Sequence, residues 1–477
     1  MTTRPLPTSQ LTAISLPPEI AVRQFWGAAG VLLLMCVSLL APGLTLGGSS
    51  LTIKGEVLLL PLVIAIYLWL LLAGRVRLIG FSGMFLVGAL FCICISLSLF
   101  YGSAVLGHAV ILRDLYEIPK ACLPVLFFAM GYEANLSEKS LRRVFQFLAG
   151  SLFLVCLFAW AQFFRLPFTR ELNVFYSAGE HADRTLMAIN RVYSTMGNPN
   201  VLGQLMDWGV AAFLLALLLG IGSWKRNLLL LGSCFVTLAM TASRYGLLGA
   251  VVDFILILGL LLPSFKHRRR VVRVALLALS LPVFLLVFRS VESSTFGVPQ
   301  RFEELRHPLQ VDSLRTRLDV VWHEAWTYIA ASPWLGHGPA KQVFSDVVTD
   351  SEYLDILKQF GVVGFLPYLG YFLVPLALIV RGLHTVRNTG HFLEDRFPAT
   401  LLAVHLAFVM GVTALFMNIG ESTLRNAPLQ GFLWMWLGLG ARAAQTAIEI
   451  SGTRSPAFRR LPNLESQPGF TEAAGGR

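Results

Sequence analysis

The stretch VLGQLMDWGVAAFLLALLLGI, residues 201–221, decides the fold class of this chain. It carries no charged side chain apart from Asp207, and it is long enough to cross the hydrocarbon core of a bilayer as one helix, which takes about 20 apolar residues. Comparable runs recur along the sequence. The predicted spans are residues 25–46, 57–73, 78–99, 111–130, 144–164, 201–221, 228–242, 245–262, 271–288, 362–380, 401–416 and 429–439. We therefore predict an all-α polytopic membrane protein with about 12 transmembrane helices.

The composition agrees with this class. Of the 477 residues, 55% are hydrophobic and only 14% are charged, whereas soluble domains carry about 25% charged residues. The net charge of +11 does not indicate a nucleic-acid partner, because the Lys and Arg residues are spread over short loops and are not gathered in one stripe. The six cysteines fall within apolar runs and lack the paired spacing of a zinc site. We therefore predict no metal, no cofactor and no disulfide framework.

The basic residues indicate the topology. They are concentrated in alternate loops, as cytoplasmic loops require, at Arg75, Arg77, Arg142, Arg143, Lys225, Arg226, Lys266 and residues 268–270. An even number of spans then places residues 1–24 and the tail, residues 446–477, on the cytoplasmic side of a membrane domain covering residues 25–445. The tail is rich in Ser, Pro and Gly and is predicted to be disordered.

Three segments are expected to share the opposite face: residues 166–200, the turn around Arg244, and the large loop 289–360 between the ninth and tenth spans. That loop holds many ionisable residues in an otherwise apolar protein, which indicates a functional role. Apolar residues recur at helical spacing over residues 313–331 and predict an amphipathic helix ending at Ser332 and Pro333. Further on, Thr349 and Glu352 have the spacing of a capping box and predict the start of the next helix.

Three separated motifs lie in these outward segments. Residues 193–203 read YSTMGNPNVLG, and residues 241–246 read TASRYG. The third begins with PWLGHG at residues 333–338 and continues with DSEYL at 350–354 and GVVG at 361–364. In order and spacing they resemble the O-antigen ligase and polymerase superfamily, whose members are multispan enzymes that move lipid-linked glycans on the outer face of the bacterial inner membrane. The resemblance covers roughly residues 191–364.

The resemblance implies transfer of an oligosaccharide from undecaprenyl diphosphate to an acceptor hydroxyl at the periplasmic face. Where the family's ligases carry a His ahead of the Tyr-Leu pair, this chain has Asp350, which favours an O-antigen or exopolysaccharide polymerase. A ligase that joins the glycan to lipid A core is the alternative within the family. A lipid-linked oligosaccharide flippase is an alternative of another class, but it predicts many charges inside the spans, where Asp207 and Asp253 are the main examples.

Site residues follow from the motifs and the chemistry. Guanidinium groups bind phosphate oxygens in pairs and stay charged, so a diphosphate can be held without a metal by arginines. The candidates are Arg191, Arg244, Arg315 and Arg317. Asp350 and Glu352 are the candidate catalytic carboxylates, which would orient or deprotonate the acceptor hydroxyl. Weaker candidates for binding the glycan are Asn198, Asn200 and Tyr353.

Each of these residues also has an ordinary structural explanation. Arg244 can extend to lipid headgroups, and Arg315 or Arg317 can belong to a solvated helix face. Asp350 can complement a helix N-terminus, and Asn198 fits a turn that caps a span. Tyr353 fits the interfacial aromatic belt. For His323 and His337 we expect loop or packing roles.

The expected partners follow from the resemblance and the composition. They are an undecaprenyl-diphosphate-linked oligosaccharide, the lipid bilayer and a polysaccharide chain-length regulator, with no nucleic acid. The expected location is the bacterial inner membrane, with both termini cytoplasmic.

Overall fold

The computed structural model describes residues 82–134, 136–176, 190–261, 316–344, 349–389, 396–422 and 427–452, together with short segments before residue 82 and with residue 186. Nearly all of the regular structure in these parts is helical. In chain order the elements are β1 (Gly43–Thr45), β2 (Thr52–Lys54), α3 (Ser82–Ala104), α4 (Leu112–Leu115), α5 (Glu117–Glu133), α6 (Glu138–Phe163), α7 (Pro167–Tyr176), η3 (Ser194–Met196), α9 (Pro199–Leu219), α10 (Trp224–Thr241), α11 (Arg244–Leu261), η7 (Arg317–Trp322), α15 (His323–Ala331), α16 (Glu352–Thr389), α18 (Pro398–Met417) and α19 (Ala427–Gly452).

The described helices confirm an α-helical membrane protein. By length and composition, 6 of them can cross a membrane: α3, α6, α9, α11, α16 and α18. Every predicted span whose residues are described coincides with a helix, and the span predicted at 111–130 is divided between α4 and α5. The spans predicted at 25–46, 57–73 and 271–288 lie outside the described residues except for isolated positions. The count of about 12 spans therefore stays a prediction.

Two boundaries differ from the prediction. Residues 43–45 form β1, which pairs antiparallel with β2, so they do not belong to the first span. Their partners include Thr52 and Ile53, whose β-branched side chains favour extended structure. At the other end, α19 continues to Gly452, past the predicted boundary at residue 445. Ala447, which is 1% exposed, extends the buried face of α19 beyond that boundary. Residues 453–477 lie outside the described part of the chain.

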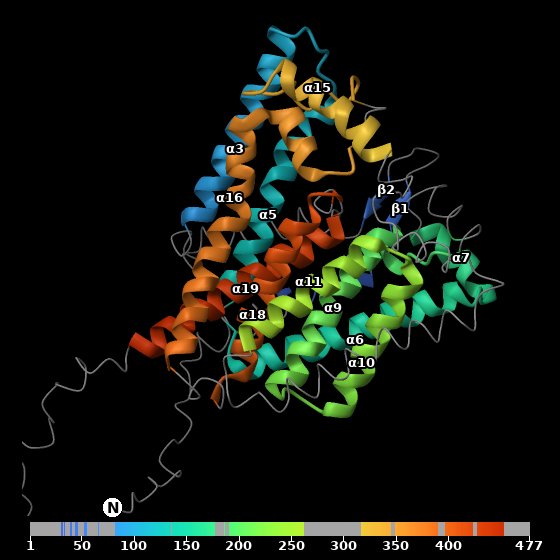
Figure 1. Cartoon of the computed structure of the whole chain (residues 1–477), viewed down its shortest axis with the longest axis vertical. Helices are drawn as coiled ribbons and strands as arrows, with labels where there is room; N and C mark the ends of the chain where they lie inside the picture. Colours follow the sequence, from blue (N-terminus) through green and yellow to red (C-terminus); the bar gives the residue numbers. More distant parts are fainter. Residues whose placement is uncertain are drawn as a thin grey trace, which may run out of the picture.

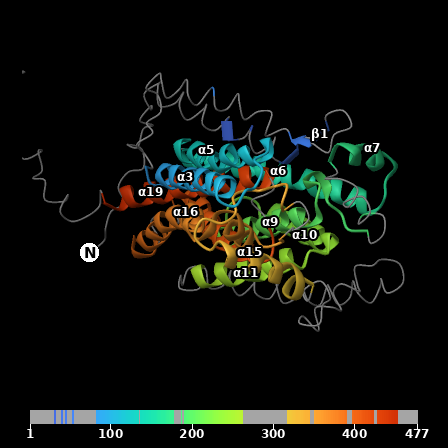
Figure 2. The same ribbon diagram turned by 90° about the horizontal axis from the view of Figure 1, so that it is seen from above.

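Helices α18 and α19 occupy the middle of the bundle and join two groups of helices (Figure 1). On one side α3, α5 and α16 pack together and against α19, and on the other α6, α9, α10 and α11 form a second group that contacts α18. Helix α15 packs against α16 at one end of the bundle and lies over that end when it is viewed from above (Figures 1 and 2). The loop that contains α15 therefore covers one end of the helices.

A close helix crossing holds α19 against α5. A β-carbon on Gly131 of α5 would collide with the carbonyl oxygen of Met435 in α19, and one on Gly438 would collide with that of Phe128. These two helices therefore approach backbone to backbone, which is how small residues allow membrane helices to pack. Helix α9, which contains the stretch quoted first, is buried along almost its whole length between α10, α11 and α18. A helix that is apolar on all sides suits such a fully enclosed position.

Helix α16 is interrupted at Gly361, and the covering loop is joined to the helix there. Gly361 has φ 62° and ψ −170°, a conformation open essentially only to glycine. The interruption leaves helix carbonyls and amides without their usual partners. The amides of His337 and Gly338 donate to the carbonyls of Lys358 and Gln359, at 3.1 and 2.9 Å.

Hydrogen bonds also run from amides of the helix to carbonyls of the loop. The amides of Val362 and Val363 donate to the carbonyls of Pro333 and Trp334, at 2.9 and 3.2 Å. The PWLGHG and GVVG motifs thus form one structural unit, in which the loop replaces the missing hydrogen bonds of the helix. This unit fixes the covering loop over the end of α16 where Asp350 and Glu352 lie.

We predict that Gly361→Ala lowers the thermal stability of the purified protein by about 1–3 kcal/mol, because alanine cannot adopt this backbone conformation without strain. Its β-carbon would also collide with the carbonyl of Trp334. The matched control is Gly232→Ala in α10, where a β-carbon meets nothing within 4 Å. Thermal unfolding in detergent measures both variants. Equal melting temperatures for the two would contradict this account of the interruption.

Candidate functional site

Polar side chains from six separate segments meet at the end of the bundle that the loop covers. We call this group the arginine–carboxylate cluster and define it as Arg191, Asn200, Tyr245, Arg317, Asp350 and Glu421. Its members come from the segment before η3, the first turns of α9 and α11, η7, the residues before α16 and the residues after α18. The segments predicted to share one face therefore do lie together.

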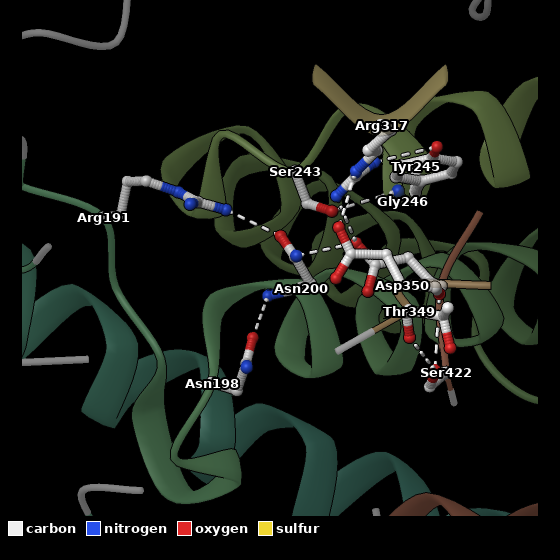
Figure 3. Close-up of polar contacts among 11 residues, drawn as sticks. Arg191, Asn198, Asn200, Ser243, Tyr245, Gly246, Arg317, Thr349, Asp350 and Ser422 are labelled. Atoms are coloured by element: carbon white, nitrogen blue, oxygen red, sulfur yellow. Dashed lines mark hydrogen bonds and ion pairs between the residues drawn. The ribbon is translucent and has the colours of Figure 1, made fainter. Parts of the chain in front are cut away.

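Arg317 is the centre of the cluster (Figure 3). Its Nε donates to Oδ2 of Asp350 at 2.6 Å, and its Nη1 donates to the hydroxyl of Tyr245 at 2.9 Å. The guanidinium carbon also lies 5.2 Å from the centre of the Tyr245 ring. Its Nη2 is 3.9 Å from Oε1 of Glu421. The guanidinium group is thus oriented by three different helix ends.

Arg191 lies on the side of the cluster opposite Arg317 (Figure 3). Its Nη2 donates to Oδ1 of Asn200 at 2.7 Å, and Nδ2 of Asn200 donates to Oε1 of Glu421, also at 2.7 Å. Its Nε donates to the carbonyl of Thr241, which is the last residue of α10. A cation placed at a helix C-terminus stabilises it. Arg191 is only 8% exposed, so it is not an ordinary loop cation.

Local capping explains how α9 and α11 present their residues. Asn198 is the N-cap of α9, and its side chain accepts a hydrogen bond from the amide of Asn200 at 2.8 Å. This confirms the capping explanation for Asn198 and directs Asn200 into the cluster. Ser243 accepts from the amide of Gly246 at 3.2 Å and caps α11 in the same way, next to Tyr245.

The cap of α16 differs from the predicted one. The helix starts at Glu352, and the side chain of Ser351 accepts from the amide of Leu354 at 3.4 Å, so Ser351 takes the role assigned to Thr349. The Thr349 hydroxyl instead donates to Asp355, at 3.1 Å. Thr349 is fully buried and lies two residues before Ser351, too early to cap the first amides of the helix.

The ends of α16 and α18 are joined, and this places two carboxylates near each other. The amide of Glu352 donates to the carbonyl of Asn418 at 3.1 Å. The hydroxyl of Ser422 lies 3.4 and 3.3 Å from the carbonyl oxygens of Thr349 and Asp350 (Figure 3). Asp350 and Glu421 therefore flank Arg317 because their backbones are tied together.

The surroundings shift the protonation of two of these groups. Burial and the neighbouring carboxylate of Asp350 raise the pKa of Glu421 to about 7, although Arg317 and Arg191 oppose the change. Burial works against the charge of Arg317, but Tyr245, Asp350 and Glu421 together raise its pKa above the ordinary value. At neutral pH the cluster thus holds fixed positive charge beside a carboxyl group able to gain or lose a proton.

Several predicted residues lie elsewhere or remain untested. Arg315 lies outside the described residues, and Arg244 begins α11 in a half-buried position next to Tyr245 in the chain. Glu352 is only 5% exposed. The Tyr353 hydroxyl donates to the carbonyl of Leu415 at 2.5 Å, and its ring packs against aromatic residues of α16.

The two histidines have the places expected of them. His337 is buried, with Nε2 2.9 Å from the carbonyl of Tyr328 and its ring against Tyr328 and Phe344. His323 is exposed at the start of α15. Within the part of the chain that the structure describes, no three His, Cys, Asp or Glu side chains come together as a metal site requires.

Sequence reasoning missed Tyr245 and did not assign a role to Glu421. Tyr245 occupies the position after Ser243 and Arg244 where the related motif often has glycine, and this departure was the signal that its side chain has a role. Glu421 follows the end of α18 in the chain and lies outside the three motifs that the sequence shows. Its contacts with Asn200 and Arg317 join residues far apart in the sequence, which no local pattern reveals.

The arrangement can bind an anion and move a proton. Comparison with known proteins adds one finding: residues 227–369 match the family described as O-antigen ligase. The matched region runs from α10 into α16 and includes Tyr245, Arg317 and Asp350. No curated protein matches the chain. The match at residues 227–369 supports a relationship of this part of the chain to the O-antigen ligase-related superfamily.

Proposed function

We propose that this protein is a membrane glycosyltransferase that moves a glycan from undecaprenyl diphosphate to a sugar hydroxyl, extending the chain as an O-antigen or exopolysaccharide polymerase does. The family match supports an O-antigen ligase or polymerase type of membrane enzyme. The observation that carries the proposal is the arginine–carboxylate cluster, where helix ends hold two guanidinium groups beside two carboxylates.

Arg317 is the main proposed contact for the donor diphosphate. Its Nε and one Nη1 hydrogen are directed to Asp350 and Tyr245, and the wider 3.9 Å separation of Nη2 from Glu421 leaves that nitrogen able to bind a phosphate oxygen. A guanidinium group held in place beforehand loses little entropy when it binds. Arg191, Arg244 and Arg315 are proposed as further contacts, and Asn198 and Asn200 as glycan contacts of lesser weight.

The position of the cluster relative to the basic residues supports a periplasmic site. Arg142 and Arg143 lie at the start of α6, and Lys225 and Arg226 at the start of α10. Both helices run from these residues towards the cluster, since Thr241 at the end of α10 contacts Arg191. Basic loops are retained in the cytoplasm. We therefore place the cluster on the periplasmic face of a bacterial inner membrane, with both termini cytoplasmic.

Two other activities remain as candidates. The family description favours a ligase, which would pass the glycan to lipid A core, whereas Asp350 in place of the ligase histidine favours a polymerase. A flippase is the candidate of another class. Asp207 and Asp253 are buried inside the bundle, as a transporter requires, but the cluster lies at the helix ends, where surface chemistry takes place. A chain-length regulator is proposed as a partner of the polymerase.

Reconstitution separates these activities. We predict that the protein in liposomes elongates an undecaprenyl-diphosphate oligosaccharide without added divalent metal and in the presence of EDTA, because arginines supply the positive charge. Gel analysis of the glycan is the measurement. Transfer that requires lipid A core would identify a ligase. Translocation across the bilayer with neither product would refute the glycosyltransferase proposal.

We predict that Arg317→Lys lowers transfer roughly 10- to 150-fold, because the substitution keeps the charge but loses paired N–H donors, and a hydrogen bond to a charged group contributes about 1.5–3 kcal/mol. Initial rates at saturating acceptor are the measurement. The control is Arg387→Lys, an exposed position near the end of α16 remote from the cluster, which should keep the wild-type rate. If both variants transfer at the wild-type rate, Arg317 does not bind the donor.

A further inference from the structure

Two carboxylates flank Arg317, but their contacts differ. Oδ2 of Asp350 accepts directly from Nε at 2.6 Å, whereas Oε1 of Glu421 is 3.9 Å from Nη2. A short charge-assisted hydrogen bond of this kind occupies Oδ2 of Asp350 and orients the guanidinium group. Asp350 is therefore well suited to hold Arg317 in place.

Glu421 has the opposite character. Oε1 is fixed by Nδ2 of Asn200 at 2.7 Å, but Oε2 accepts no hydrogen bond from any described residue. The side chain is 19% exposed, compared with 40% for Asp350. One oxygen is thus anchored while the other stays available in a partly buried position, which is the geometry that a general base needs.

We infer that Glu421 is the residue that accepts the proton of the acceptor hydroxyl, with Asp350 acting as a positioning residue for Arg317. The inference rests on the proposed glycosyl transfer. In that step the hydroxyl oxygen forms a bond to the anomeric carbon of the donor sugar. The bond from that carbon to the diphosphate oxygen breaks, and undecaprenyl diphosphate leaves with the electron pair. The hydroxyl proton passes to Oε2 of Glu421.

The charges around Glu421 agree with this role. Arg317, Asp350 and Arg191 act on it from three segments, and the hydroxyl of Tyr245 faces it from α11. Burial is the largest influence and raises the pKa of Glu421 to about 7. A base with a pKa near the working pH combines a useful unprotonated fraction with adequate strength. Because only the unprotonated form accepts a proton, the rate is expected to rise as the pH passes upward through about 7.

The test uses the full-length protein in liposomes, with an undecaprenyl-diphosphate oligosaccharide as donor and a wild-type control. Glu421→Gln keeps the shape of the side chain, including an oxygen that can accept from Asn200, but it cannot take up the proton. We expect transfer to fall roughly 10²- to 10⁴-fold. The KM for the donor should change little, and the rise of rate with pH should disappear. Glu324→Gln is the control, since Glu324 is exposed on α15 in the same covering loop.

A second variant tests the role of Glu421 without changing Glu421 itself. Asp350→Asn removes the negative charge that raises the pKa of Glu421, and it also frees Arg317 to approach Glu421. Both effects lower the pKa, so the midpoint of the pH–rate profile should move to lower pH. A purely structural role for Glu421 predicts no such movement.

Each outcome decides the inference. If the wild-type protein transfers glycan and Glu421→Gln has the same rate and the same pH profile as the wild type, the inference is overturned. The proposed function then remains intact. If Glu421→Gln fails to fold, the Asp350→Asn midpoint decides: a shift to lower pH supports the inference and a fixed midpoint overturns it. A wild-type protein that transfers no glycan to any acceptor would overturn the proposed function and the inference with it.

Discussion

The backbone exchange at Gly361 is the constraint on which the site depends. A helix that stops and restarts near a membrane surface must satisfy the carbonyls and amides that the interruption frees. Here the loop residues 333–338 satisfy them, with hydrogen bonds running in both directions. The backbone of the loop is therefore fixed to the backbone of the helix by hydrogen bonds on both sides of Gly361. Because η7 and α15 lead directly into residues 333–338, these backbone hydrogen bonds determine where Arg317 lies relative to the ends of α9, α11 and α16.

The cluster is built from helix ends for a physical reason. Ends carry unpaired backbone groups and need polar caps, so they are the places in an apolar bundle where polar side chains are tolerated. Asn198 caps α9, Ser243 caps α11, and Arg191 binds the last carbonyl of α10. Each cap positions an adjacent or contacting residue of the cluster. The requirements of the fold and of the site are thus met by neighbouring residues in the same short turns.

The sequence predicted the parts of this arrangement that depend on local patterns. Hydrophobic runs located the described spans, and helical spacing located η7 and α15. It grouped Arg191, Arg317 and Asp350 on one face of the membrane, and they do lie together. The prediction from sequence failed where two neighbouring residues fit the same role, or where residues far apart in the chain come into contact. Thr349 and Ser351 both fit a helix cap, and only burial of Thr349 against Asp355 decides between them. Glu421 meets Asn200 across 221 positions of sequence.

Charge balance links the two halves of the proposed reaction. Arg317 is shared between Asp350 at 2.6 Å and Glu421 at 3.9 Å, so the second carboxylate competes with an incoming phosphate for Nη2. When Glu421 takes up the acceptor proton it becomes neutral, and its attraction for Nη2 falls. At the same moment negative charge grows on the departing diphosphate. Arg317 can then turn its free donors to the leaving group while Asp350 keeps it in place, so proton transfer and departure of the diphosphate assist each other through one guanidinium group.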